Sequence, residues 1–183
     1  MEFRTLDDVN RFNAKQRQQL VAMVRDADPE QRTWRPAPEK WSMQEHFEHV
    51  ALLMQLLTPI VEELTAKAPP ATPETTPNVD CLAVMVASGI ANTKFKAPPP
   101  TEPQGRSVEE SFALLEQSHH RMLACVERFP ALDTDKVTYL HPAGVAVNLA
   151  QLWHLIGLHD NRHIEHMRAN AEAWATRDQV QRA

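Results

Sequence analysis

Histidines are the residues in this chain whose type and spacing point most directly to chemistry. Residues 159–163 read HDNRH, in a stretch whose core-type positions recur every three or four residues, which predicts a helix. Two histidines four residues apart lie on one face of a helix, one turn apart, so both imidazoles of His159 and His163 can reach a single metal ion. Core histidines that hydrogen-bond to their neighbours are the alternative interpretation of this spacing.

A third histidine on another predicted helix strengthens the case for a metal site. His49 follows a helix-start signal, Ser42 with Glu45, and shares an apolar helical face with leucines further along. If the two helices run antiparallel, the start of one lies level with the later half of the other, and His49 approaches His159 and His163. Three neutral imidazoles in an apolar interior are costly unless something polar binds them, and a divalent metal does so. The residues therefore favour a metal site.

Two further residues are candidates for an outer layer around the metal. Asp160 stands where an HExxH zinc protease has its glutamate base, but aspartate is one methylene shorter, and we do not expect a protease. We interpret Asp160 either as a hydrogen-bond acceptor for a ligand or as a surface acid. His119 lies on the core-facing stripe of a third helix. It either lines the same cavity as the three candidate ligands or is a hydrogen-bonded core histidine.

Four long helices must position these side chains. Helical periodicity and start signals place them at about residues 5–28, 42–67, 107–129 and 148–174 or beyond. The connections at 28–41 and 130–147 read as loops. The sequence therefore predicts an all-α fold, a four-helix bundle with long connections.

Proline shapes the longest connection of the predicted bundle. Eight of the 14 prolines lie between residues 69 and 103, where they prevent a long helix and favour extended structure. Residues 79–88 are apolar enough for a short extra helix inside this stretch. We predict a single domain over residues 1–183, with a proline-rich insertion at about 69–106.

Composition excludes several classes of protein. The chain has 19 Lys plus Arg against 24 Asp plus Glu, a formal net charge of −5, which argues against a general nucleic-acid binder. Its two cysteines are too few for a disulfide framework. The N-terminus has no apolar signal segment, and the longest apolar stretch, at residues 50–61, is too short to cross a bilayer. We expect a cytoplasmic protein with no membrane partner.

Two segments resemble motifs of the DinB/YfiT-like family, which comprises metal-binding four-helix bundles. KWSMQEHFEHV at residues 40–50 resembles the family's Trp-Ser pair, an acid three residues later and a metal-binding histidine eight residues after the tryptophan, here His49. HPAGVAVNLAQLWHLIGLHDNRHIEHM at residues 141–167 resembles its His-Pro-x-x-Gly approach to a last helix that ends in an HxxxH pair, here His159 and His163. The two motifs occur in the family's order.

The resemblance implies a cytoplasmic bundle, often a homodimer, in which His49, His159 and His163 hold a divalent zinc, nickel or iron ion with open coordination positions. Some members of the family are transferases or isomerases that use a low-molecular-weight thiol such as glutathione, mycothiol or bacillithiol. The family commonly has glutamine three residues after the last ligand, where this chain has His166. His166 therefore either lies in the outer layer of the site or supplies a fourth nitrogen ligand.

The sequence is compatible with three functions of different classes. One is a metal-dependent thiol S-transferase or a related small-molecule enzyme, in which the metal acts as a Lewis acid on the sulfur of the cosubstrate. No catalytic base is evident, although His166 or Asp160 could move a proton. The second is a non-catalytic, stress-associated bundle that binds a metal or small ligand. The third is a helical interaction protein without a metal.

Overall fold

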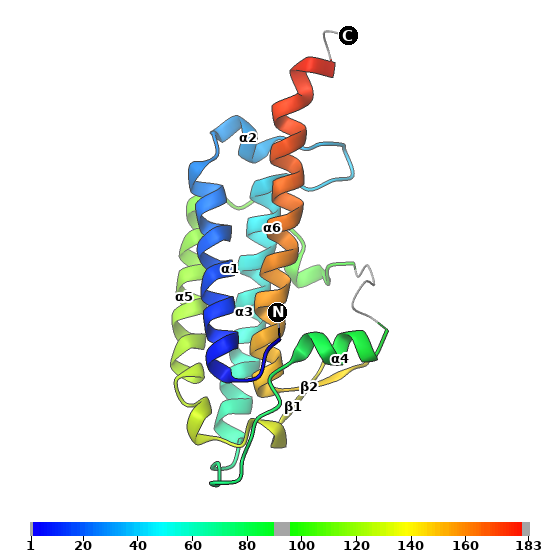
Figure 1. Cartoon of the computed structure of the whole chain (residues 1–183). Coiled ribbons are helices and arrows are strands. Elements are labelled where there is room, and N and C mark those ends of the chain that lie inside the picture. The colour runs from blue at the N-terminus through cyan, green and yellow to red at the C-terminus, as the bar shows by residue number, and fades with distance from the viewer. Residues whose placement is uncertain (1, 90–95, 181–183) are drawn as a thin grey trace.

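Four long helices lie side by side in the computed structural model, which describes residues 2–89 and 96–180, with side chains described as far as residue 177. The bundle consists of α1 (Leu6–Asp26), α3 (Met43–Lys67), α5 (Val108–Val126) and α6 (Leu149–Val180), as Figure 1 shows. Helix α3 packs against both α5 and α6, and α1 packs against α6. The predicted all-α four-helix bundle is confirmed.

Reciprocal side-chain caps start all four helices. The Ser42–Glu45 and Ser107–Glu110 pairs both form complete capping boxes, and so does Thr5–Asp8 at the start of α1. At the start of α6, Asn148 and Gln151 exchange the same pair of bonds between side chain and backbone N–H. Each box satisfies two backbone donors that a helix leaves unpaired, which fixes where the helix begins.

The connections hold more structure than the sequence predicts. The 28–41 loop contains α2 (Pro29–Thr33), which begins at a proline, and the 130–147 loop contains an antiparallel hairpin of β1 (Thr138–Leu140) and β2 (Ala146–Asn148). Gly144 has a φ of +79° in the hairpin turn, a conformation that favours glycine. Two predicted helix ends are too long, since α1 stops at Asp26 and α5 at Val126.

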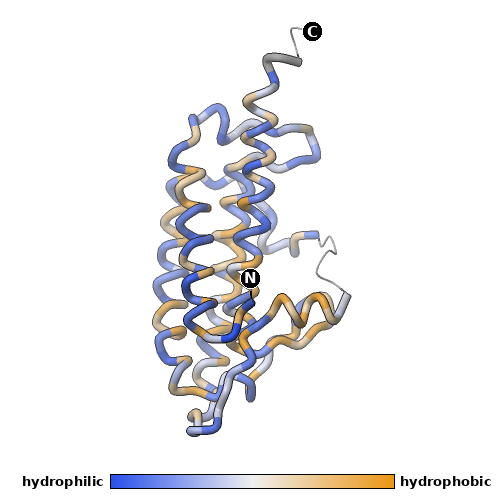
Figure 2. The backbone as a smooth tube through the Cα atoms, in the orientation of Figure 1, coloured by the Kyte–Doolittle hydropathy of each residue, from blue (hydrophilic) through white to orange (hydrophobic). Residues whose placement is uncertain are grey.

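The proline-rich connection carries two short elements. The predicted short helix is α4 (Cys81–Ala87), and η1 (Pro99–Thr101) is a single 3₁₀ turn beside α3. Residues 90–95 of this predicted insertion lie outside the described residues. Figure 2 shows apolar positions recurring along the bundle helices and gathered in α4 and the hairpin. Within the described ranges, no helix is both long and apolar enough to cross a membrane.

A glycine lets α1 approach α6 closely. A Cβ atom on Gly157 would lie 1.8 Å from Oδ1 of Asn13, whose side chain is buried between the two helices. Asn13 Nδ2 donates a hydrogen bond to the Trp153 carbonyl at 2.6 Å, so the amide has little freedom to move away. This close packing holds α6, the helix that carries His159 and His163, against α1.

We expect Gly157→Ala to lower the free energy of unfolding by about 1–3 kcal/mol, because the new methyl group must displace the Asn13 amide from its buried hydrogen bond. Urea unfolding measures the change. In an Asn13→Ala background the same substitution should cost clearly less, because only the Phe12 ring, with Cδ1 at 3.1 Å from the new Cβ, then has to move, and the helix propensity of alanine offsets part of that cost. An equal cost in both backgrounds would contradict this account of the contact.

Candidate metal centre

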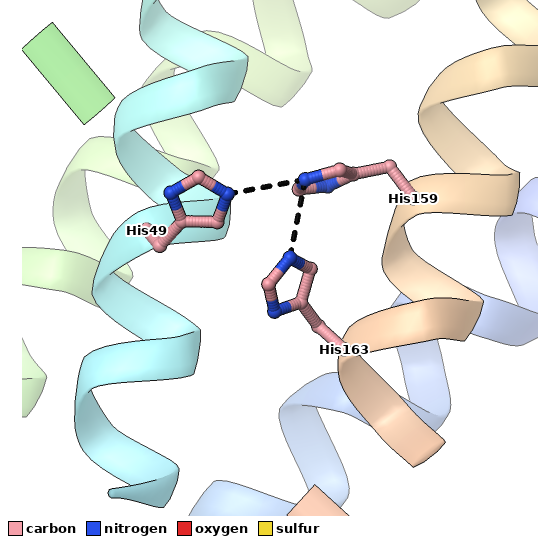
Figure 3. A group of neighbouring side chains, drawn as sticks. All are labelled: His49, His159 and His163. Atoms are coloured by element: carbon pink, nitrogen blue, oxygen red, sulfur yellow. Dashed lines mark hydrogen bonds between the residues drawn. The ribbon is translucent and has the colours of Figure 1, made fainter. Parts of the chain in front are cut away.

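Three histidines from two helices meet in the middle of the bundle. His159 Nε2 lies 3.1 Å from Nε2 of His49 and 3.1 Å from Nε2 of His163 (Figure 3). One ring nitrogen from each residue lies within 4.8 Å of the other two. Nitrogen ligands at 2.0–2.1 Å from a tetrahedral zinc ion stand about 3.3 Å apart, so the two separations of 3.1 Å suit one ion.

A backbone carbonyl orients His49. Its Nδ1 lies 2.6 Å from the carbonyl oxygen of Thr101, a fully buried residue in η1. A carbonyl only accepts, so Nδ1 of His49 carries the proton and donates it there. The lone pair of His49 is therefore on Nε2, which is the atom that faces His159.

A fourth histidine, His46, orients His163 as the Thr101 carbonyl orients His49. Nδ1 of His163 lies 2.9 Å from Nδ1 of His46, one turn before His49 on α3. When His163 offers its Nε2 lone pair to an ion, its Nδ1–H donates to His46. His46 has no predicted role, although its i, i+3 spacing from His49 places both residues on one helical face and is a signal for this contact.

The outer candidates lie apart from the three converging nitrogens. His166 is exposed, and its ring is parallel to that of His46, with centroids 5.2 Å apart. His119 is half-buried on α5, where its ring faces Trp153 at 6.5 Å. Neither side chain belongs to the group of nitrogens found here that could share one ion.

Asp160 is no surface acid. It is only 2% exposed and forms a 2.8 Å ion pair with Arg17, which links α6 to α1. Burial raises the pKa of its carboxyl to about 6, although the charge of Arg17 and its hydrogen bond act in the opposite direction. The pair joins the two helices one residue away from His159.

Trp41 lies beside the histidines and also lines a cavity. Its ring centroid lies 5.0 Å from that of His49 and 6.4 Å from that of His163, and its carbonyl accepts a hydrogen bond from Asn170 on α6. The same tryptophan lines a cavity of about 500 Å³. The rest of the wall consists of Arg35, Glu45, Lys96, Ala97, Glu102 and Pro103. A small molecule of mixed charge could be held beside the histidine cluster.

Burial keeps the imidazoles neutral. The pKa of His46 is lowered to about 3, mainly by loss of solvation and in smaller part by the neighbouring His166 and His49. Burial, with the neighbouring imidazoles, also holds the pKa values of His159 and His163 well below their usual range. The pKa of His49 is lowered by burial, in part offset by its bond to Thr101. Neutral imidazole is the form that binds a metal.

We expect the metal-free protein to lose stability between pH 7 and pH 5.5. Histidines of the unfolded chain take up protons near pH 6.5, whereas the buried ones do not, so the unfolded state binds more protons and its free energy falls as the pH falls. Asp160, with its pKa raised to about 6, opposes this trend below that pH. The net loss in unfolding free energy should be about 2–4 kcal/mol.

Urea unfolding at the two pH values measures this dependence. His46→Gln keeps an acceptor for His163 but cannot titrate, so its pH dependence should be shallower than that of the parent. Equal stability of the parent at pH 7 and pH 5.5 would contradict the assignment of neutral buried imidazoles.

Comparisons with known proteins agree with this architecture. Residues 13–167 match the sequence model of the DinB superfamily. The four-helix bundle protein TT2238 is 22% identical, with a TM-score of 0.60 over 90% of this chain and 99% of that one. YfiT from Bacillus subtilis, described as a probable metal-dependent hydrolase with an unusual four-helix bundle topology, is 17% identical, with a TM-score of 0.60 over 93% of this chain and 87% of its own. No curated protein matches the sequence.

Proposed function

The chain belongs to the DinB superfamily, and on that premise we propose that it is a metal-dependent enzyme acting on a small molecule, with a divalent ion held by His49, His159 and His163. One observation carries the proposal. The ring nitrogens of the three side chains converge, while the second nitrogens of His49 and His163 are engaged by Thr101 and His46. Ligand histidines in metalloproteins are oriented by partners of this kind.

The donor set narrows the choice of ion. Imidazole nitrogens suit zinc, nickel and iron, whereas magnesium and calcium prefer oxygen ligands. Three protein ligands are typical of catalytic sites, which keep a position open, whereas structural zinc sites use four. The ion would supply Lewis-acid polarisation of a substrate atom.

Other residues of the chain orient the ligands and line the neighbouring cavity. Thr101 and His46 hold the imidazoles of His49 and His163 in the ligand tautomer, so neither ring has to turn when the ion binds. Trp41 packs against His49 and forms part of the wall of the neighbouring cavity. In that wall Arg35 is paired with Glu45 and Lys96 with Glu102, so charged groups of a substrate would share or replace these partners.

The reaction we propose is transfer to or from a low-molecular-weight thiol, in a cytoplasmic homodimer, as the resemblance to thiol-dependent members of the family suggests. Hydrolysis is a second candidate for the same site, since the structurally similar YfiT is described as a probable metal-dependent hydrolase. A non-catalytic metal-binding bundle is a third, because His46, His159 and His163 are held neutral and so are poor proton donors at neutral pH.

Elemental analysis of tag-free protein purified without chelator tests the site. We expect about one divalent ion per chain in the parent and none in the His49→Ala, His159→Ala, His163→Ala triple variant, because His46 and His166, which remain there, do not supply three converging nitrogens. His120→Ala, which removes an exposed histidine from α5, is the matched control and should keep the parent's metal content. A parent that takes up no zinc, nickel or iron after reconstitution would refute the proposal.

The metal-loaded protein then distinguishes the reactions. Thiol-dependent consumption of electrophiles, abolished by a chelator and restored by the metal, supports the transferase. Cleavage of esters or amides without a thiol, with the same chelator sensitivity, supports the hydrolase. Neither activity in broad panels, despite a bound ion, supports the binding protein.

A further inference from the structure

One segment of the proline-rich connection is fastened to α3 beside the histidine cluster. Residues 97–106, called the strap here, contain η1, which contacts α3. The strap supplies the Thr101 carbonyl that lies 2.6 Å from Nδ1 of His49. The orientation of His49 therefore depends on how the strap is held.

A buried carboxylate on α3, that of Glu48, holds the strap in place. Glu48 is 0% exposed, and its oxygens accept hydrogen bonds from the backbone N–H groups of Gln104 at 2.8 Å and Gly105 at 3.1 Å. One turn earlier on α3, Gln44 Nε2 donates to the Arg106 carbonyl at 2.9 Å. A buried carboxylate is costly unless its oxygens are hydrogen-bonded, so withdrawal of the strap would leave Glu48 without these partners.

The backbone of the strap is shaped for this contact. Gly105 has a φ of +82°, a conformation that side-chain-bearing residues rarely adopt, and it directs its N–H to Glu48. No atom lies within 4 Å of the position that a Cβ would take at Gly105. A substitution there strains the backbone of the strap without creating a clash.

We propose that Glu48 is a positioning residue for the metal centre: by anchoring the strap through Gln104 and Gly105, it holds the Thr101 carbonyl where it fixes His49 as an Nε2 ligand. The part of this inference that concerns metal affinity rests on the proposed function. The part that concerns the tautomer of His49 stands on the contacts of the metal-free protein.

Mutual stabilisation of the strap and the ion follows from this arrangement. If the docked strap favours the ligand form of His49, it raises the affinity for the ion, and the bound ion must favour the docked strap by the same factor. Zinc should therefore slow hydrogen exchange at the amides of residues 101, 102 and 104–106, although none of these residues is among the three metal ligands.

Glu48→Gln tests the role of the carboxylate with little change of shape. The amide has one acceptor oxygen, and its NH₂ group would face a backbone N–H, so one of the two anchoring bonds is lost. We expect zinc affinity, measured by competition with a chromophoric chelator, to fall about 10–100-fold, and strap amides to exchange faster in the metal-free protein. Glu63→Gln, an exposed acid on the same helix, is the matched control and should behave as the parent.

Gly105→Ala is the second variant, and it leaves Glu48 and its charge in place. It should weaken zinc binding in the same direction, whereas Gly89→Ala, at a φ of +72° with equally open space, should not. This pair keeps the test decisive if Glu48→Gln fails to fold. Parent-like zinc affinity in Gly105→Ala together with a loosened strap would overturn the inference, and so would parent-like affinity in a folded Glu48→Gln.

Imidazole ¹⁵N chemical shifts separate the inference from the proposed function. In the metal-free parent, His49 should be the Nδ1–H tautomer, and Glu48→Gln and Gly105→Ala should shift it towards a mixture. If the parent binds no metal but the two variants still show this change, the proposed function fails and the positioning role stands. If the parent binds zinc but the tautomer and affinity are unchanged in both variants, the positioning role fails alone.

Discussion

Buried imidazoles must remain neutral and hydrogen-bonded, and the packing of α3 against α6 meets this requirement. His46 and His49 on α3 face His163 and His159 on α6, so each helix supplies partners for the other. Two aligned pairs across one interface fix both the rotation of the helices and their relative height. A shift by one turn would leave at least one buried ring nitrogen without a partner, which is costly in an apolar interior.

Helix α1 gives the interface its rigidity. Gly157 lets α1 lie close to α6, and the Arg17–Asp160 pair and the Asn13 bond to Trp153 join the two helices. Helix α6 therefore packs against both α1 and α3, and the Arg17–Asp160 pair lies next to His159. Ligands on packed helices can be placed more precisely than ligands on loops.

Local signals in the sequence were sufficient for the framework and for the central histidines. The caps at Ser42 and Ser107 predict the helix starts. Helical spacing, with the two helices antiparallel, predicts that His49 lies near His159 and His163. Glu48 was not found, because an acid on a helix is usually solvated, and its burial depends on a segment 56 residues away. The partner of Asp160 could not be found either, since Arg17 lies on another helix and nothing local specifies that pairing.

The histidine cluster joins parts of the chain that are synthesised far apart in time. His49 and His159 are separated by 110 residues, so the three-histidine site exists only after the last helix has been made and has packed against α3. An incomplete chain can offer His49 alone, and an unpacked α6 only its HxxxH pair. An ion that needs all three ligands would therefore bind tightly to finished, folded molecules and leave nascent chains unoccupied.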